Sequence, residues 1–581
     1  MSNKEIADIF YKLAIFLEMD KKAFKPQAHE RAGASLEALK QDVYTIYKNG
    51  GLPALEQIPG VGRGLAFKIE EYLKTGRLRE YEDYKRKLPV KLDELLAVEG
   101  IGPQKIKFLY QKLGITDIKS LARAAKQDKI AGLPGFGKAS EENIIEAIAF
   151  LSKSNGRFLL AEILPLAEEI VSRLEKLKEV KQISLAGSLR RMKETAGDVD
   201  ILAVASSPDK VMDFFVNFPG VVKVWARGRT KSSVRVGQGF DIDLRLVPEK
   251  SYGSALQYFT GSKEHNIALR VLAMSKGLKL NEYGLFNGSK MIGGRTEKGI
   301  YRLLGLSYIE PEIREDKGEL QNKQPRLITL NEVKGDLHCH SEWASGDNSI
   351  LEMAQAAMLR GYQYIGISDH TKFLRIENGL DEKQLSEQRK EIDALNVEIS
   401  KYRNADMSKF RILQGAEVNI LNDGRIDIND QALSKLDYVI AGVHSSLKMP
   451  KQKMTERIIR AMKNPYVKII SHPTGRLIMK RDEYQLDFDR FLRATKETNA
   501  ILEINSSPKR LDLNDQNIRR AKQSGVKMII NTDSHQKEQL EFMKYGVAQA
   551  RRGWAESKDI VNTLPLAGLL KVFSMPRERG E

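Results

Sequence analysis

Short apolar runs recur along the C-terminal half of the chain, and each of them ends in a polar residue. The runs cover residues 332–340, 364–370, 410–417, 437–444, 467–472, 500–505 and 526–535. Each holds a stretch of mostly β-branched or apolar residues with the length of a strand. Most of the intervals have helical periodicity, as at 350–361 and 381–402. Because strands that alternate with helices pair in parallel, their polar ends meet at one mouth, and the pattern predicts a βα barrel.

The polar residues at these strand ends are suited to binding metal ions. Six of the eight histidines lie there, namely His338, His340, His370, His444, His472 and His535. The acidic residues near them are Asp347, Asp369, Glu417 and Asp533. Imidazole and carboxylate together suit Zn, Mn or Fe. A lone strand histidine is usually a core residue, whereas six at strand ends predict a site for several cations, and such a site favours phosphoester hydrolysis.

The motifs at 338–340, 368–370, 415–417 and 532–535 resemble those of the PHP (polymerase and histidinol phosphatase) family, over about residues 333–575. The resemblance implies a (βα)7-type barrel that binds up to three Mn²⁺, Zn²⁺ or Fe²⁺ ions. The ligands it implies are His338, His340, Asp347, His370, Glu417, His444, His472, Asp533 and His535. The loop at 344–347 reads Ala-Ser-Gly-Asp where the family usually has Ser-Asp-Gly, and Asp347 is the acidic residue in this loop.

In the N-terminal third, two glycines spaced two residues apart occur three times between helical segments, at 58–62, 98–102 and 133–137. Such a turn is tight and leaves backbone N–H groups uncovered at the start of the second helix, where a phosphate can bind. One copy would be only a turn, but three copies in a basic protein predict contacts with a nucleic-acid backbone. They resemble helix-hairpin-helix motifs, and the glycines are Gly60, Gly62, Gly100, Gly102, Gly135 and Gly137.

Residues 60–78 resemble the small N-terminal domain of the DNA polymerase beta family. The resemblance places on Lys68 the Schiff-base lysine that excises the sugar phosphate at an incised abasic site. A nearby lysine of the family is Gly64 here. An amine needs a depressed pKa for imine formation, so a Lys68 that only contacts a phosphate is the alternative interpretation.

Residues 182–204 and 240–247 predict two strands with acidic residues on one face. The period of two places Asp198 and Asp200 on the same side, and Asp243 repeats the arrangement on the second strand. Three carboxylates on adjacent strands can hold two Mg²⁺ ions that lower the pKa of an attacking hydroxyl and neutralise a triphosphate. Together with the preceding Gly-Ser turn, this pattern predicts nucleotidyl transfer, with Ser188 and Arg191 placed to hold phosphates.

The same region resembles the palm and thumb of family X DNA polymerases at 187–191, 243–248, 258–262, 266 and 281–283. The resemblance implies that Asp198, Asp200 and Asp243 are catalytic and bind Mg²⁺ or Mn²⁺. The residues it implies for binding the incoming nucleotide are Gly187, Ser188, Arg191, Tyr258, Phe259, Gly261 and Asn266. Animal enzymes of the family have Arg where this chain has Asp241, whose role the sequence leaves open. His29 and His265 are expected at the surface or against DNA.

Composition narrows the class of partner. The 581 residues include 94 Lys and Arg against 77 Asp and Glu, a net charge of +17 that favours a polyanionic partner such as nucleic acid. The single cysteine, Cys339, excludes an intramolecular disulfide and is typical of a reducing compartment. Because no run of about 18 apolar residues occurs, we expect no membrane span, and we place the protein in the bacterial cytoplasm, at the nucleoid while it works.

The two resemblances cover almost the whole chain and predict a multidomain protein with α-helical N-terminal helix-hairpin-helix domains and an α+β nucleotidyltransferase palm. The predicted parts are an N-terminal DNA-binding domain (1–85), a fingers-like domain (86–150), a palm (151–250), a thumb (251–315), a linker (316–332) and a PHP nuclease domain (333–575).

This order matches bacterial family X polymerases with a C-terminal PHP domain. It implies a monomeric, template-directed polymerase that uses deoxynucleoside triphosphates to fill short gaps in gapped or primed duplex DNA during base excision repair. It also implies a metal-dependent 3′ to 5′ exonuclease, with abasic-site processing, in the PHP domain. The alternatives are a PHP-type small-molecule phosphatase fused to a DNA-binding module and a non-catalytic DNA scaffold.

Overall fold

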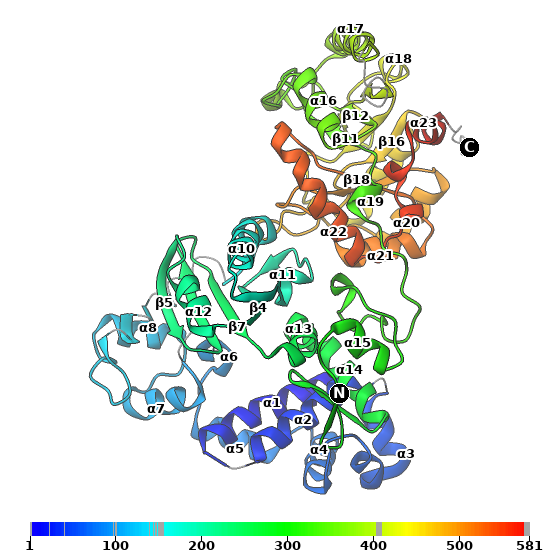
Figure 1. Ribbon diagram of the computed structural model, residues 1–581. Coiled ribbons are helices and arrows are strands. Elements are labelled where there is room, and N and C mark those ends of the chain that lie inside the picture. The colour runs from blue at the N-terminus through cyan, green and yellow to red at the C-terminus, as the bar shows by residue number, and fades with distance from the viewer. Residues whose placement is uncertain are drawn as a thin grey trace.

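The computed structural model describes residues 3–574 except for 23, 40, 97, 99–100, 139, 143, 146–147, 149–155 and 402–408. Gly100, a predicted hairpin glycine, therefore lies outside the described residues. The N-terminal helices lie at one end of the molecule, a mixed sheet lies beside its middle, and the C-terminal αβ part forms the other end (Figure 1). Among the described helices, none combines the length and the apolar character that crossing a bilayer requires.

The N-terminal part is helical, as predicted. Its helices are α1 (Asn3–Met19), α2 (Lys25–Ala38), α3 (Val43–Glu56), α4 (Arg63–Thr75), α5 (Arg79–Lys87), α6 (Leu92–Leu96), α7 (Pro103–Leu113) and α8 (Ile118–Lys126). Helix α1 contributes to two hydrophobic cores. Phe10 packs into the core that includes residues of α2 to α4, and Phe16 packs into the core that includes residues of α6 to α8. Gly62 and Gly102 are the N-cap residues immediately before α4 and α7, which is where the hairpin pattern placed them.

The central part is a five-stranded sheet with the order β2-β4-β7-β6-β5, in which β4 and β7 are parallel. Its elements are β1 (Phe158–Leu159), α10 (Leu160–Glu175), β2 (Val180–Leu185), α11 (Gly187–Arg190), β3 (Thr195–Ala196), β4 (Asp198–Ala205), α12 (Pro208–Val216), β5 (Val221–Arg227), β6 (Lys231–Val236) and β7 (Asp241–Leu246). Along β4, Val199 and Ile201 pack into the cluster that contains α10 and α12, whereas Leu202 packs into the cluster of the next helix, α13 (Tyr252–Thr260). Strand alternation therefore places Asp198 and Asp200 on the α13 side of the sheet.

The segment after α13 combines helices with a small antiparallel sheet of the order β10-β9-β8. Its elements are α14 (Lys263–Ser275), β8 (Leu278–Asn281), β9 (Gly284–Asn287), β10 (Lys290–Gly293) and α15 (Glu297–Leu303). The N-terminal part packs on it, since the Lys263 ammonium lies 4.0 Å from the centre of the Tyr11 ring.

The predicted linker at 316–332 is packed rather than free. Glu319 is fully buried and accepts hydrogen bonds from the backbone N–H groups of Asp316 and Lys317 at 2.8 and 2.7 Å. Its carboxylate also lies 2.6 Å from Nδ1 of His265, which is itself fully buried, so the surface role expected for His265 is wrong. Ile328 joins the core of the C-terminal part.

The C-terminal part alternates parallel strands with helices, as predicted. Its strands are β11 (Gly335–Cys339), β12 (Tyr364–Ile367), β13 (Arg411–Gln414), β14 (Glu417–Asn419), β15 (Val439–Gly442), β16 (Val467–Ile470), β17 (Ile501–Asn505) and β18 (Met528–Asn531). Its helices are α16 (Ile350–Leu359), α17 (Glu382–Ile399), α18 (Asp430–Leu433), α19 (Lys451–Met462), α20 (Phe488–Glu497), α21 (Asp515–Gln523), α22 (Met543–Arg552) and α23 (Leu566–Ser574).

The predicted closed (βα)7 barrel is not confirmed. The strands form one sheet of three (β11-β12-β13) and one of five (β14 to β18), and the described residues join the two sheets at single bridges, His370 to Glu417 and Cys339 to Ser534. All four bridging residues are in or beside the predicted metal site.

A buried glycine tests how tightly this sheet is packed. On strand β12, a Cβ at Gly366 would lie 2.0 Å from the hydroxyl oxygen of Tyr438, whose O–H donates to the Leu337 carbonyl at 2.6 Å. We expect Gly366→Ala to lower stability by about 2–3 kcal/mol, because neither the tyrosine nor the strand can move away. Thermal unfolding followed by circular dichroism measures the loss.

Gly568→Ala on α23 is the matched control. Its nearest neighbour would be Leu564 Cβ at 3.4 Å, an ordinary contact, and alanine favours a helix over glycine. This variant should keep or slightly raise the melting temperature. Equal melting temperatures for both variants would show that the sheet tolerates the extra methyl group.

Candidate active sites

The central sheet brings the three predicted aspartates together. On the parallel strands β4 and β7, Asp198 pairs with Asp241 and Asp200 with Asp243. The backbone of the Gly-Ser turn closes on the same point, because a Cβ at Gly187 would lie 2.6 Å from Oδ2 of Asp200. Gly187 also has φ +60°, a left-handed conformation that favours glycine. The turn and the carboxylates thus form one compact site.

Burial of like charges gives this site its electrostatic character. Burial raises the pKa of Asp200 to about 7, with further contributions from Asp198 and Asp243. The pKa of Asp198 is also raised, by partial loss of water around a side chain that still reaches the surface and then by Asp243. The Lys231 ammonium lies 2.7 Å from Asp243 Oδ2 and offsets part of the repulsion. Divalent cations would remove the rest, which fits the oxygen-rich donor set that Mg²⁺ and Mn²⁺ prefer.

The fourth carboxylate, Asp241, has its own partners. Arg235 binds it through two N–H groups, each 2.8 Å from a carboxylate oxygen, and the Trp225 indole N–H donates to it at 2.8 Å. Asp241 is therefore engaged in an ion pair across β6 and β7. Where the animal enzymes have Arg, this chain has Asp241, and Arg235 on the neighbouring strand balances its charge.

The residues predicted to bind a nucleotide surround the turn and the end of α13. The Arg191 guanidinium donates to the Thr260 carbonyl and to Glu315 at 3.1 Å. A Cβ at Gly261 would lie 3.0 Å from the same guanidinium. Tyr258 and Phe259 meet edge to face with ring centres 5.2 Å apart.

Two other members of this set differ in how far the structure engages them. Asn266 is half-buried, and its amide donates to the Tyr258 carbonyl at 2.6 Å and accepts from Gln257 at 2.7 Å. Ser188, half-buried, lies in the short helix α11.

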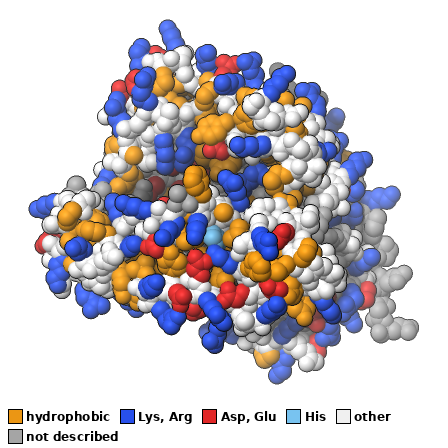
Figure 2. Space-filling view, turned by 90° about the horizontal axis from the view of Figure 1, so that it is seen from below, with side chains coloured by type: hydrophobic (Ala, Val, Ile, Leu, Met, Phe, Trp, Pro, Cys, Tyr) orange, Lys and Arg blue, Asp and Glu red, His pale blue; other side chains and the backbone are white. Residues whose placement is uncertain are grey.

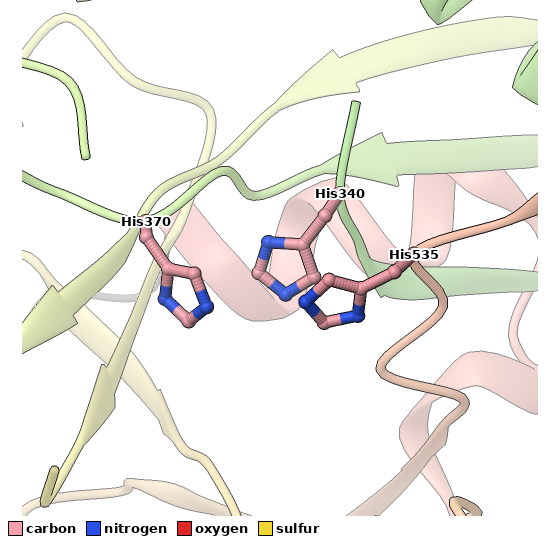
Figure 3. Close-up of side chains that lie close together, drawn as sticks. All are labelled: His340, His370 and His535. Atoms are coloured by element: carbon pink, nitrogen blue, oxygen red, sulfur yellow. The ribbon is translucent and has the colours of Figure 1, made fainter. Parts of the chain in front are cut away.

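The second candidate site lies at the C-terminal ends of the parallel strands. Figure 3 shows the rings of His340, His370 and His535 side by side with His340 in the middle, and its ring centre is 4.4 Å from that of His370 and 4.2 Å from that of His535. Within the part of the chain that the structure describes, three groups of residues each bring their ligand atoms within 4.8 Å of one another. They are His340 with His370 and His535, His338 with His340 and Asp533, and His370 with Glu417 and His444.

Glu417 lies at the centre of this cluster and contacts four imidazoles. Its Oε2 is 2.9 Å from His370 Nδ1 and 3.3 Å from His338 Nε2. Its Oε1 is 2.9 Å from His472 Nε2 and 3.2 Å from His444 Nε2. Burial by itself would raise the pKa of Glu417, but the surrounding imidazoles hold it well below its usual range.

Several buried atoms of this cluster lie close to one another but form no hydrogen bond of acceptable geometry with any described residue. They are His338 Nε2, His340 Nδ1, His370 Nδ1 and Glu417 Oε2. Leaving buried polar atoms without hydrogen bonds costs free energy, so this arrangement indicates that the atoms coordinate metal ions instead. Imidazole nitrogens and carboxylate oxygens are ligands for Zn, Mn and Fe, and the residues present therefore fit a group of cations.

Two predicted acidic residues lie outside these three groups. Asp347 is exposed, and its carboxylate accepts a hydrogen bond from Gln536 at 2.6 Å. Asp369 is buried beside the cluster, but its oxygens accept hydrogen bonds from Ser341 and Gln388. Its Oδ1 also lies 3.9 Å from His340 Nδ1, so it stands directly behind this imidazole.

Glu503 and Asn419 hold the predicted imidazole ligands in place, and neither was recognised from the sequence. Glu503 in β17 is fully buried, with one carboxylate oxygen 2.7 Å from His338 Nδ1 and the other accepting from the His472 backbone N–H at 2.8 Å. Asn419 Oδ1 lies 2.7 Å from His444 Nδ1. Such partners fix which imidazole nitrogen faces a metal. A glutamate inside the apolar run at 500–505 was the signal available.

Comparison with known families agrees with this architecture. The chain matches a helix-hairpin-helix domain (1–78), a SAM-like helix-hairpin-helix tandem (92–149), a DNA polymerase beta thumb (255–315) and a PHP domain (336–507). It is 39% identical over 573 residues to the DNA polymerase/3′-5′ exonuclease PolX of Bacillus subtilis strain 168, a match that covers 97% of this chain and 98% of the relative. The chain belongs to the bacterial family X DNA polymerases that carry a PHP domain.

More distant relatives match separate parts of this family X chain. Rat DNA polymerase lambda is 30% identical over 293 residues, which is 44% of this chain and 48% of the relative. A protein named "Probable phosphatase" from Caldanaerobacter subterraneus is 32% identical over 212 residues, or 34% of this chain and 75% of that protein.

In the N-terminal part of this family X chain, the predicted lyase residue has a defined environment. Lys68 Nζ lies 2.7 Å from His29 Nε2 and pairs with Glu80. His29 is 3% exposed, so the surface role expected for it is wrong. Nearby, the first hairpin glycine, Gly60, lines a cavity of about 580 Å³ together with Arg31, Lys263, Arg270 and Lys279.

The raised pKa of Asp200 predicts how stability depends on pH in metal-free protein. The ordinary pKa is 3.8, and burial raises it to about 7 in the folded state. Folded protein therefore retains a proton that unfolded protein loses, and this contribution to stability disappears as the pH rises through about 7. At pH 8 in a chelator, Asp200→Asn should raise stability by up to about 4 kcal/mol, and the gain should shrink toward pH 5 and vanish only below the ordinary pKa of 3.8.

Thermal unfolding in chelator at both pH values measures this effect. Asp209→Asn is the control, because the Asp209 side chain is exposed on α12 and pairs at 3.3 Å with Arg229. This variant should show no gain that grows with pH. A melting temperature of Asp200→Asn equal to that of wild type at pH 8 would contradict the raised pKa of Asp200.

Proposed function

We propose that this protein is a template-directed DNA polymerase that fills short gaps in duplex DNA during base excision repair, and a metal-dependent 3′ to 5′ exonuclease. The observation that carries the proposal is the presence of two separate clusters of metal-binding side chains in one basic chain. One consists of three aspartates beside a Gly-Ser turn, and the other of imidazoles around Glu417. The similarity to Bacillus subtilis PolX along the whole chain supports both activities.

In the polymerase site, we assign the catalytic and metal-binding roles to Asp198, Asp200 and Asp243. Mg²⁺ or Mn²⁺ bound there would supply the positive charge that lowers the pKa of the primer 3′ hydroxyl and neutralises the triphosphate. Asp243 faces the primer hydroxyl in this assignment. The tight Gly187 turn, Ser188 and Arg191 hold the phosphates, while Tyr258, Phe259, Gly261 and Asn266 border the sugar and base.

In the nuclease site, we assign metal binding to His338, His340, His370, Glu417, His444, His472, Asp533 and His535, with Asp347 as a further ligand. Up to three Mn²⁺, Zn²⁺ or Fe²⁺ ions would there activate a water and neutralise the departing oxygen. Glu503 and Asn419 fix the direction of the imidazoles at 2.7 Å. We also propose that this part processes abasic sites. We propose as well that its strands form a closed (βα)7 barrel.

DNA contacts are assigned to the three hairpins through Gly60, Gly62, Gly100, Gly102, Gly135 and Gly137. Backbone N–H groups at a helix start bind phosphate whatever the base sequence. The net charge of +17 supports this, and Figure 2 shows Lys and Arg side chains spread over the face that it presents, among acidic and apolar ones. The proximity of Lys68 to His29 and Glu80 is compatible both with a lyase nucleophile and with a phosphate contact.

The proposal retains the predicted organisation. It places the domain limits at 1–85, 86–150, 151–250, 251–315, 316–332 and 333–575. We also propose that the protein is a monomer and that it binds gapped or primed duplex DNA and deoxynucleoside triphosphates. Its proposed location is the bacterial cytoplasm, at the nucleoid while it works.

A second candidate is a small-molecule phosphatase activity of the C-terminal part. The "Probable phosphatase" of Caldanaerobacter subterraneus, 75% of which matches this chain, favours it. The two candidates differ in product. Release of inorganic phosphate from small monoesters, without shortening of a labelled DNA strand, would support the phosphatase.

Separate metal sites predict that the two activities can be separated. Asp198→Ala combined with Asp200→Ala should reduce primer extension by at least about a thousandfold, because the metal ligands are lost, and should leave strand degradation intact. His338→Ala combined with His340→Ala should have the opposite effect. A labelled gapped duplex incubated with Mn²⁺, with and without deoxynucleotides, reports both activities on one gel. Continued extension by the first variant would refute the polymerase site.

A further inference from the structure

One side chain of the C-terminal part reaches into the nucleotide-binding loop of the central part. Arg552 ends helix α22, and its side chain is 3% exposed. Its NH1 group donates to the backbone carbonyl of Arg191 at 2.9 Å and to Glu315 at 3.1 Å. Its NH2 group donates to Asp515 at 2.7 Å, which holds it from its own domain. Arg552 therefore connects two parts of the chain that are 361 positions apart.

Glu315 is shared between two arginines. Its Oε1 accepts from Nε of Arg191 and from NH1 of Arg552, each at 3.1 Å. Burial alone would raise the pKa of Glu315, but Arg552, Arg191 and Lys193 hold it below its usual range. The carboxylate is therefore ionised, and each arginine alters how strongly it holds the other.

We propose that Arg552 is a positioning residue for nucleotide binding, supplied by the PHP domain to the polymerase site. It acts through the Arg191 carbonyl and through the carboxylate of Glu315. The inference rests on the proposed function, because it takes Arg191 as a residue that holds the triphosphate.

Three physical effects of Arg552 act in the same direction. Its hydrogen bond to the Arg191 carbonyl anchors the end of the turn that begins at Gly187. By sharing Glu315, it weakens the hold of that carboxylate on Arg191, so the guanidinium can exchange the Thr260 carbonyl for a phosphate oxygen. Its positive charge also offsets that of Glu315, so the surroundings of Arg191 are less negative. Removing it should weaken nucleotide binding without changing the reacting groups.

Arg552→Met in the full-length protein tests the proposal. On a gapped duplex with Mg²⁺, we expect the KM for the deoxynucleoside triphosphate to rise about tenfold, which is less than the effect of truncating a direct charge partner, because Arg552 acts through Arg191 and Glu315. The value of kcat should stay within about twofold of wild type. Exonuclease activity should not change, and it shows together with the melting temperature that the variant is folded.

Arg551→Met is the matched control. Arg551 is the preceding residue of α22 and also bridges domains, through Glu312 at 2.7 Å and the Ile328 carbonyl at 2.9 Å. The hydrogen bonds and ion pairs found for it do not include Arg191 or Glu315. Its KM should remain that of wild type. An equal rise in KM for both variants would mean that general loosening of the interface is responsible, and would overturn the proposal.

Further variants separate the possible failures. Arg552→Lys retains the positive charge, so its KM should lie between those of wild type and Arg552→Met. If Arg552→Met does not fold, Arg552→Lys is the variant compared with wild type. In a Glu315→Gln background, replacing Arg552 should raise KM by clearly less than in wild type, because the two residues act together; full additivity would refute a route through Glu315.

Arg191→Ala distinguishes this inference from the proposed function. If Arg191→Ala leaves the nucleotide KM unchanged, the proposed nucleotide site is wrong, and the positioning role of Arg552 is refuted with it. If Arg191→Ala raises KM and Arg552→Met does not, only the positioning role is refuted.

Discussion

The cost of burying ionised groups is the constraint on which both candidate sites depend. Carboxylates taken out of water lose hydration, and carboxylates placed beside one another repel. In the central sheet, Asp200 and Asp243 are half-buried and lie beside the more exposed Asp198, and the pKa of Asp200 rises to about 7 as a result. A fold retains such an arrangement where a counter-charge arrives from outside. Divalent cations meet this need, and they are also what phosphoryl-transfer chemistry requires.

The C-terminal cluster meets the same constraint in a different way. Glu417 is surrounded by imidazoles, so its charge is compensated even without a cation, and its pKa stays well below its usual range. The cost appears instead as buried nitrogens without hydrogen-bond partners, such as His338 Nε2 and His370 Nδ1. Carboxylates alone suit Mg²⁺ at the polymerase site, whereas mixed imidazole and carboxylate ligands favour transition metals. The two sites can therefore select different ions in one solution.

Local patterns in the sequence were enough to predict much of this architecture. A period of two placed Asp198 and Asp200 on one face, and polar residues at strand ends predicted the imidazole cluster, because both depend on backbone geometry alone. Closure of the barrel and the burial of His265 could not be predicted in this way. His265 depends on Glu319, 54 positions away, and no local pattern marks a histidine that will be enclosed by a distant carboxylate. The partner of Asp241 could not be predicted either. Arg235 is only six positions away, but the two side chains meet because strands β6 and β7 pair with each other.

The connection between the two domains follows from where their charges lie. Arg552 has Asp515 on one side and Glu315 on the other, so it bridges the domains without leaving a buried charge unpaired. Since coupling between sites is reciprocal, any free energy by which Arg552 favours nucleotide binding must also strengthen the docking of the two domains when a nucleotide is bound. Binding of the nucleotide would then hold the C-terminal domain in place against the palm during synthesis. The two chemistries can thus keep separate metals and separate substrates while sharing one buried ion-pair network.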